Sequence, residues 1–199
     1  MPFGKEREKV KLKTPIKRSL VIITIILLSV LIGIIYDSVW KGIDRKSYPR
    51  EYSEYVEVYS EKYGVPEYVI YGVIKYESNF DSGCRAEDGG VGLMGLSESE
   101  FDYLLRLDMA SLDSDSRYGP ETSIKYGSFL LAHLHAKFGS WDAVLAAKTV
   151  PVTEWEDWLR DSSCYDEDGV FVNVPDPEAM ERGEKIAEYV QKYREMYYD

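Results

Sequence analysis

The chain has 199 residues, with 24 lysines and arginines against 35 aspartates and glutamates, which gives a formal net charge of -11. Domains that bind nucleic acid through bulk positive charge are basic, so this balance excludes that class. Hydrophobic residues make up 45% and charged residues 30% of the chain, which is typical of a globular protein and too apolar for a disordered one.

The charge is divided unevenly along the chain. Residues 1–18 hold seven basic and two acidic side chains, a net of +5, which leaves -16 for the rest. Residues 19–36 carry no charged side chain, and at about 1.5 Å per residue a helix of this length just crosses a hydrocarbon core of roughly 30 Å. We therefore predict one transmembrane helix over 19–36 that contacts the lipid bilayer. A cleaved secretion signal is the alternative, but no small-x-small pattern follows the apolar run.

The basic flank precedes the predicted span, so the positive-inside rule puts residues 1–18 in the cytoplasm as a basic tail and the rest outside the cell membrane. Residues 37–47 are polar with one glycine and predict a linker to a domain over 48–199. The only two cysteines of the chain, Cys84 and Cys164, lie in the exported part. A disulfide between them is permitted there, and the sequence leaves its formation open.

Residues 48–199 predict a mainly α domain, because segments of helical periodicity follow one another. The expected helices begin near Pro49, Pro66, Ser97, Pro120, Trp141 and Asp176, and those with a clear end stop at Gly64, Glu77, Gly139 and Ala147. The Ser97-x-x-Glu100 pattern is typical of a capping box. A short turn is expected over 155–159 and a brief extended stretch over 170–174. Residues 79–95 hold five glycines and predict a loop.

Glu77 has the most informative position. It follows Ile70 by seven residues and Val73 by four, so helical geometry puts its carboxylate on or beside the apolar stripe of its helix. Burial without a basic partner raises the pKa of a carboxyl group, which favours the neutral form that a general acid needs near neutral pH. The alternative, a solvated or capping glutamate, is the more common role for a single glutamate at a helix end.

Three ordered segments of the chain form a recognisable series: Gly64–Phe80, Gly89–Met94 and Pro120–Gly127. They resemble the soluble lytic transglycosylase family of the lysozyme superfamily. They match the family's helix ending E-S-x-F, its G-A-x-G-L-M-Q loop and its P-E-T-N-I-x-x-G helix start. The similarity covers about residues 48–199. It implies a lysozyme-like, mainly α transglycosylase domain that acts on peptidoglycan glycan strands, with proteins of cell-wall synthesis or division as candidate partners.

The resemblance also implies a mechanism in which Glu77 is the catalytic residue. Glu77 would protonate the glycosidic oxygen between N-acetylmuramic acid and N-acetylglucosamine, and would then take a proton from the muramoyl 6-hydroxyl to give a 1,6-anhydro sugar. The acetamido group of the substrate can replace a second carboxylate. No convincing partner acid for Glu77 is evident, although Asp81 and Glu87 lie in the following loop. No cofactor is implied.

Four further residues match substrate-binding positions of the family. Ser78 would orient the carboxylate or a sugar acetamido group, and Gly92, Leu93 and Met94 would line the cleft. For Met94, packing in the core is an equally good alternative. No metal site is predicted, because two histidines in one helix, His133 and His135, are two residues apart and point in different directions.

Several cleft positions depart from the family pattern. Gly95 stands for the family's Gln, Ser123 for its Asn, Lys148-Thr149 for the Tyr and Asn of Y-N-A-G, and Arg182 for the Tyr of the last helix. Each lost sugar hydrogen bond would weaken transition-state binding by about 0.5–1.5 kcal/mol. The sequence therefore leaves three functions open: a lytic transglycosylase, a hydrolase similar to goose-type lysozymes, or a glycan-binding or scaffold module without catalysis.

Overall fold

The computed structural model describes residues 22–35 and 46–199. Residues 22–35 form a helix whose large apolar side chains are all more than half exposed. Among the described residues, no helix is both long and apolar enough to cross a membrane. The predicted transmembrane helix is therefore not supported by the described part of its range. The predicted basic tail over 1–18, residues 19–21 and 36 of the predicted helix, and most of the predicted linker lie outside the described residues.

A second unit of the chain runs from Arg50 to Asp199, and its named elements are all helices. Its elements in chain order are α2 (Ser53–Tyr63), α3 (Glu67–Glu77), α4 (Glu98–Leu107), η1 (Ser114–Tyr118), α5 (Pro120–Phe138), α6 (Trp141–Ala147), α7 (Val152–Trp158), η2 (Ser162–Cys164) and α8 (Pro177–Tyr197). The predicted mainly α fold is confirmed. Two expectations differ from the structure: α7 is a helix that begins at Val152, and an isolated bridge between Tyr165 and Phe171 replaces the extended stretch.

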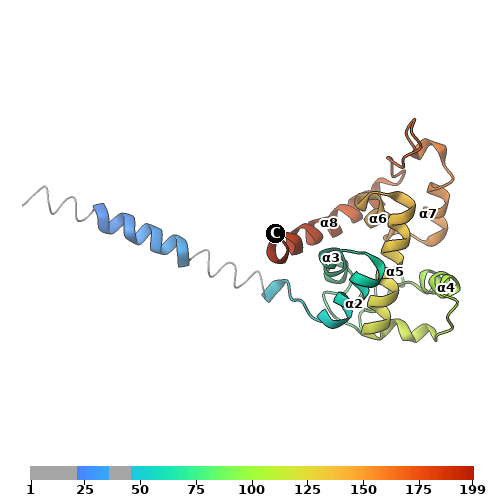
Figure 1. The fold of residues 1–199 in the computed structure, drawn as a ribbon, viewed down its shortest axis with the longest axis horizontal. Helices are drawn as coiled ribbons and strands as arrows, with labels where there is room; N and C mark the ends of the chain where they lie inside the picture. Colours follow the sequence, from blue (N-terminus) through green and yellow to red (C-terminus); the bar gives the residue numbers. More distant parts are fainter. Residues whose placement is uncertain (1–21, 36–45) are drawn as a thin grey trace, which may run out of the picture. The chain divides into compact units, whose positions relative to one another are not determined.

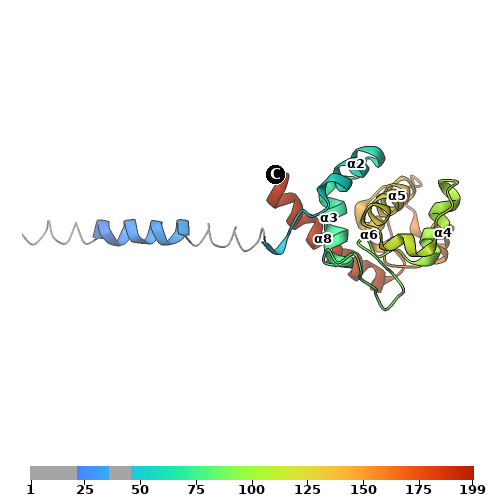
Figure 2. The same cartoon turned by 90° about the horizontal axis from the view of Figure 1, so that it is seen from below.

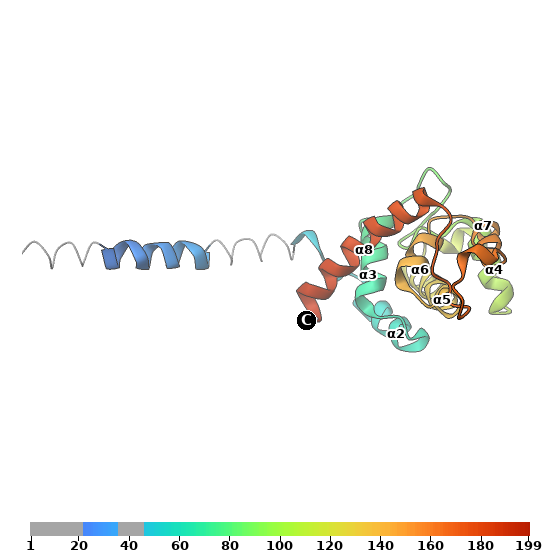
Figure 3. The same cartoon turned by 90° about the horizontal axis from the view of Figure 1, so that it is seen from above.

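The long helix α5 lies at the centre of this unit. It lies between α2 and α3 on one side and α4 on the other (Figures 1 and 2), and it also packs against α6. Helix α8 lies along both α3 and α6, as Figure 3 shows. Gly183 permits this approach, because a Cβ atom there would meet the backbone of Ala146 in α6. The ends of α3 and α6 are thereby held on the same side of the unit.

The local sequence accounts for the helix ends near this junction. Helix α3 buries Ile70, Val73 and Ile74, and it stops at Glu77 because Asn79 and Phe80 take left-handed backbone angles. Helix α4 begins with the predicted capping box. Cys84 and Cys164, which both belong to the described part of the chain, are free thiols.

Candidate active site

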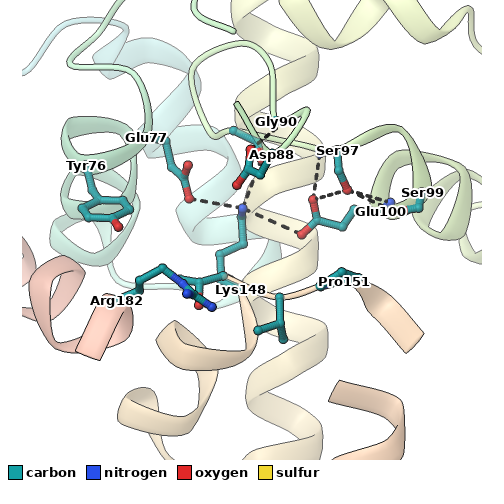
Figure 4. A pocket seen from close by; sticks show the side chains of 13 residues that line it. Tyr76, Glu77, Asp88, Gly90, Ser97, Ser99, Glu100, Lys148, Pro151 and Arg182 are labelled. Atoms are coloured by element: carbon teal, nitrogen blue, oxygen red, sulfur yellow. Dashed lines mark hydrogen bonds and ion pairs between the residues drawn. The ribbon is translucent and has the colours of Figure 1, made fainter. Parts of the chain in front are cut away.

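Glu77 is the last residue of α3, and its side chain is only 11% exposed. It lines a pocket that the C-terminal end of α3 shares with the loop over 79–95, the start of α4 and the segment after α6 (Figure 4). The pocket is lined by Tyr76, Glu77, Asp88, Gly90, Gly95, Ser97, Ser99, Glu100, Lys148, Thr149, Val150, Pro151 and Arg182. The predicted catalytic glutamate therefore faces a concave site whose lining includes several charged and polar side chains.

Lys148 is the cation of this pocket that is closest to Glu77. It follows the buried helix α6, and its side chain is only 2% exposed. Its Nζ atom donates a hydrogen bond to Oε1 of Glu77 at 3.3 Å and to the carbonyl oxygen of Gly95 at 3.2 Å. Figure 4 shows the ammonium group between the carboxylates of Glu77 and Glu100. The premise that Glu77 is buried without a basic partner is therefore wrong.

Glu100 is the second carboxylate beside Lys148. One oxygen, Oε2, accepts hydrogen bonds from the backbone amide and the hydroxyl group of Ser97 at 2.8 and 2.7 Å. The other oxygen, Oε1, lies 3.8 Å from Nζ of Lys148. The capping box thus fixes Glu100 at the start of α4 and aims its free oxygen into the pocket. Sequence reasoning recognised the capping box but not this contact.

Burial raises the pKa of Glu77 above that of a solvated glutamate, the nearby charge of Glu100 adds to this effect, and Lys148 opposes it. Burial of Lys148 acts to lower its pKa, but Glu100 and Glu77 outweigh burial and raise it. Lys148 therefore stays protonated at neutral pH. The cluster holds one ammonium group and two carboxyl groups. A proton on Glu77 therefore removes one negative charge from the cluster. A neutral Glu77 is the form that can donate a proton to a leaving oxygen.

Gly95 makes room for this arrangement. Its φ angle is 57°, and a Cβ atom at this position would collide with Oε2 of Glu77. Its carbonyl oxygen is also an acceptor for Lys148. Gly95 and Lys148, which were read from the sequence as two separate departures from the family pattern, therefore belong to one arrangement around Glu77.

Ser78 ties the glycine-rich loop to the end of α3. Its hydroxyl oxygen lies 3.0 Å from the carbonyl oxygen of Ile74 and 2.9 Å from that of Leu93, and it accepts a hydrogen bond from the amide of Phe80 at 3.2 Å. These contacts fix the backbone on either side of Glu77. The predicted role of Ser78 in orienting the carboxylate or a sugar stays a prediction.

Gly92, Leu93 and Met94 are not among the residues that line the described pocket. The side chains of Leu93 and Met94 are fully buried. The amide of Met94 donates to the hydroxyl of Ser123 at 3.1 Å, and its side chain packs where a Cβ atom on Gly127 would lie. Core packing, the alternative for Met94, is what the structure has. Substrate contact by Ser78 and these three residues stays a prediction.

Thr149 and Arg182, which also depart from the family pattern, have defined contacts. The hydroxyl group of Thr149 donates to the carbonyl oxygen of Ala146 at 2.8 Å. Arg182 lines the pocket, with ion pairs of 3.9 Å to Asp176 and to Glu178. In residues 22–35 and 46–199, no group of three or more His, Cys, Asp or Glu side chains is arranged to hold a metal ion.

The family described as "Transglycosylase SLT domain" matches residues 54–157, which is just over half of the chain. The chain belongs to this family. Its SLT domain includes Glu77, Gly95, Glu100 and Lys148, so the whole cluster lies inside the matched region. The sequence resemblance is confirmed at the level of family.

Solved structures of lytic transglycosylases share the fold. The 70 kDa soluble lytic transglycosylase in complex with bulgecin A has a TM-score of 0.66 and 19% identity, over 78% of this chain and 26% of that one. The 70 kDa enzyme from Escherichia coli has 0.66 and 17%, over the same shares. An inactive Glu-to-Gln mutant of Slt from Pseudomonas aeruginosa has 0.60 and 20%, over 74% of this chain and 24% of that one. The chain spans about a quarter of the length of these proteins.

Proposed function

We propose that this SLT domain is a peptidoglycan lytic transglycosylase that cleaves the bond between N-acetylmuramic acid and N-acetylglucosamine and forms 1,6-anhydro-N-acetylmuramic acid. The observation that carries the proposal is the nearly buried carboxyl group of Glu77 at the wall of a pocket that other charged side chains also line. Membership of the SLT family and the lytic transglycosylase fold support it.

In the proposed reaction, Glu77 acts first as an acid and then as a base. The proton of its carboxyl group moves to the glycosidic oxygen as the bond from C1 to that oxygen breaks. The acetamido group of the sugar stabilises the positive charge that develops at C1. The muramoyl 6-hydroxyl oxygen then bonds to C1, and its proton returns to Glu77. One carboxyl group therefore serves both steps, and its raised pKa supplies the proton for the first.

The test is to incubate the full chain with peptidoglycan and to analyse the products by mass spectrometry. The proposal predicts 1,6-anhydromuropeptides from the wild type and none from Glu77→Gln. Glu181→Gln is a matched control, because Glu181 is exposed on α8 and pairs with Lys185. Equal product from wild type and Glu77→Gln, or no cleavage by the wild type, would overturn the proposal.

Hydrolysis, as in goose-type lysozymes, is resolved by the same spectra. Water in place of the 6-hydroxyl as the acceptor gives a reducing end, and the product is heavier by one water. The fold and Glu77 are compatible with either acceptor. A product with a reducing end that depends on Glu77 would replace the transglycosylase proposal with a hydrolase.

A binding module without catalysis is favoured by one specific observation. Lys148 already occupies one oxygen of Glu77, and the Tyr and Asn of the family pattern are absent next to it. This function predicts that glycan strands bind equally well to wild type and Glu77→Gln and are not cleaved. Sedimentation of the full chain with insoluble peptidoglycan, together with the product analysis, distinguishes it from both enzymes.

We also propose that the domain works outside the cytoplasm, held at the cell membrane by residues 19–36. The uncharged run in this range and the basic residues before it support the proposal. The described helix over 22–35 is about 21 Å long, which is shorter than a hydrocarbon core of roughly 30 Å. Retention in the membrane pellet after alkaline extraction, and protease access to the SLT domain from outside, are the expected results. Release into the supernatant would contradict the anchor.

A further inference from the structure

The ammonium group of Lys148 makes two hydrogen bonds and one longer ion pair, all of them with protein groups. It donates to Oε1 of Glu77 at 3.3 Å and to the carbonyl oxygen of Gly95 at 3.2 Å, and it lies 3.8 Å from Oε1 of Glu100. Two of the three ammonium hydrogens are thus used in hydrogen bonds, and the contact with Glu100 is an ion pair. Since the side chain is only 2% exposed, these three groups replace the water that a lysine normally keeps.

The contacts also confine Glu77. Lys148 lies at one carboxylate oxygen, and Gly95 lies so close to the other that a Cβ atom at this position would displace the Glu77 carboxylate. Lys148 contacts Gly95 as well, so the three residues form a closed set of contacts. Glu100 completes the set, and its position is fixed independently by the capping box of α4.

We propose that Lys148 is a positioning residue for Glu77: with Gly95 and Glu100 it fixes the direction of the Glu77 carboxyl group and sets the pH at which that group loses its proton. The catalytic consequence rests on the proposed function, whereas the contact itself does not. The departures at Gly95 and Lys148 then replace a sugar-binding surface with an internal support for the acid.

Charged and titratable groups reach this pocket from every surrounding element. Lys148 extends from the end of α6, Glu100 from α4, Asp88 from the loop over 79–95, and Arg182 from α8. Tyr76 precedes Glu77 in α3. Of these, Lys148 is the cation in contact with Glu77, while Glu100 and Asp88 add negative charge. Loss of Lys148 and loss of Glu100 must therefore move the titration of Glu77 in opposite directions. A role limited to folding would not produce opposite signs.

The first experiment measures the direction in which the titration of Glu77 shifts, and it does not require catalytic activity. The glutamate side-chain carboxyl carbons of the full chain are labelled with ¹³C and titrated by NMR, and the Glu77 signal is identified by its loss in Glu77→Gln. The midpoint should move to higher pH in Lys148→Met, to lower pH in Glu100→Gln, and stay near the wild-type value in Lys148→Arg. An unchanged midpoint in Lys148→Met, or shifts of the same sign in Lys148→Met and Glu100→Gln, would overturn the proposal.

The second experiment measures the consequence for the reaction. Lys148→Met should lower kcat by about ten- to a hundredfold, as expected for a misplaced catalytic group, with a smaller change in KM. The alkaline limb of its pH profile should move to higher pH, and Lys148→Arg should recover most of the loss. Lys125→Met is the matched control, because Lys125 forms its ion pair with Asp108 at 2.9 Å and does not line the pocket in the described structure.

The two experiments separate this inference from the proposed function. If the NMR shifts have the expected signs and the wild type cleaves nothing, the positioning contact stands and the proposed enzyme fails. If the wild type cleaves peptidoglycan and the pH profile of Lys148→Met matches that of the wild type, the positioning role fails and the enzyme stands. Should Lys148→Met not fold, Glu100→Gln should still move the midpoint to lower pH while Lys148→Arg leaves it near the wild-type value, and a shift to higher pH in Glu100→Gln would overturn the proposal.

Discussion

Lys148 and Glu77 are 71 residues apart in the sequence, and their side chains meet at 3.3 Å in one pocket. Because of this contact, the altered cleft position at Lys148 is more than the loss of a sugar-binding group. A lysine in place of a tyrosine removes an aromatic hydroxyl, but it also gives the buried acid a fixed partner of opposite charge. The free energy of a buried carboxyl group depends strongly on such a partner, so the chemistry of Glu77 is set jointly by both residues.

The pH dependence of activity should follow Glu77. Its raised pKa means that the acid form is present at lower pH and is lost as the pH rises through that pKa, so kcat/KM should fall on the alkaline side. The same titration affects stability. A group whose pKa is higher in the folded state than in the unfolded state contributes stability below its unfolded pKa and loses it as the pH rises through the folded pKa.

Thermal unfolding of wild type and Glu77→Gln from about pH 4 to about pH 8 checks this sign. The unfolding temperature of Glu77→Gln should rise relative to that of the wild type as the pH rises, because glutamine cannot lose a proton in the buried site. A difference that is constant with pH would show that Glu77 has the same pKa in the folded and unfolded states.

Gly95→Ala should disturb the site more than its backbone angle alone explains. Both Gly95 and Gly64 have positive φ, at 57° and 70°, so alanine at either position costs about 1–2 kcal/mol of backbone strain. Only at Gly95 does the added methyl group also meet the carboxylate of Glu77, whereas at Gly64 it enters open space.

Denaturant unfolding and the cleavage assay distinguish the two glycine variants. Gly64→Ala should lose stability and keep its activity per folded molecule, whereas Gly95→Ala should lose both. Equal activity in Gly64→Ala and Gly95→Ala would mean that Glu77 can move away from its position without consequence.

Ser78→Ala should destabilise the loop that carries the pocket. It removes the hydroxyl group that bridges Ile74, Leu93 and Phe80, so buried backbone groups lose a partner, at a cost of about 1–3 kcal/mol. Ser128 is the matched control, since its buried hydroxyl has no hydrogen-bond partner among the described residues. Calorimetry should find Ser128→Ala neutral or more stable. A similar loss in both variants would assign the effect to packing.

Ser97→Ala should weaken α4 and release Glu100. The loss of the capping hydroxyl costs about 0.5–2 kcal/mol of stability, and Oε2 of Glu100 loses one of its two donors. Chemical denaturation measures the first effect, and the NMR titration of Glu77 measures the second. Ser53→Ala, at an exposed position at the start of α2 and outside the described pocket lining, is the control. A titration of Glu77 that is identical in Ser97→Ala and wild type would show that the cap does not position Glu100.

The helices of the domain and several of their ends could be predicted from the sequence, because the signals that set them act over short distances along the chain. Apolar residues at helical spacing, a Ser-x-x-Glu cap and left-handed glycines act through neighbours within one or two turns, so they predicted the start of α4 and the ends of α2, α3 and α5. The same periodicity placed Glu77 at the end of a mostly buried helix. The helix α7 was underestimated because it is short, and its buried Val152, Trp155 and Trp158 are too few for a clear period.

Only the tertiary structure decided what surrounds Glu77. Lys148 meets it because α8 holds α6 beside α3, and Glu100 reaches Lys148 because the start of α4 lines the same pocket. The buried places of Ser78 and Met94 likewise depend on partners 15 and 29 residues away along the chain. Helical periodicity reports which face of a helix is buried, but it does not report which other helix covers that face. The sequence therefore located Glu77 at the end of its helix. The packing of helices from distant parts of the chain determined which groups contact Glu77 and in which direction its pKa is shifted.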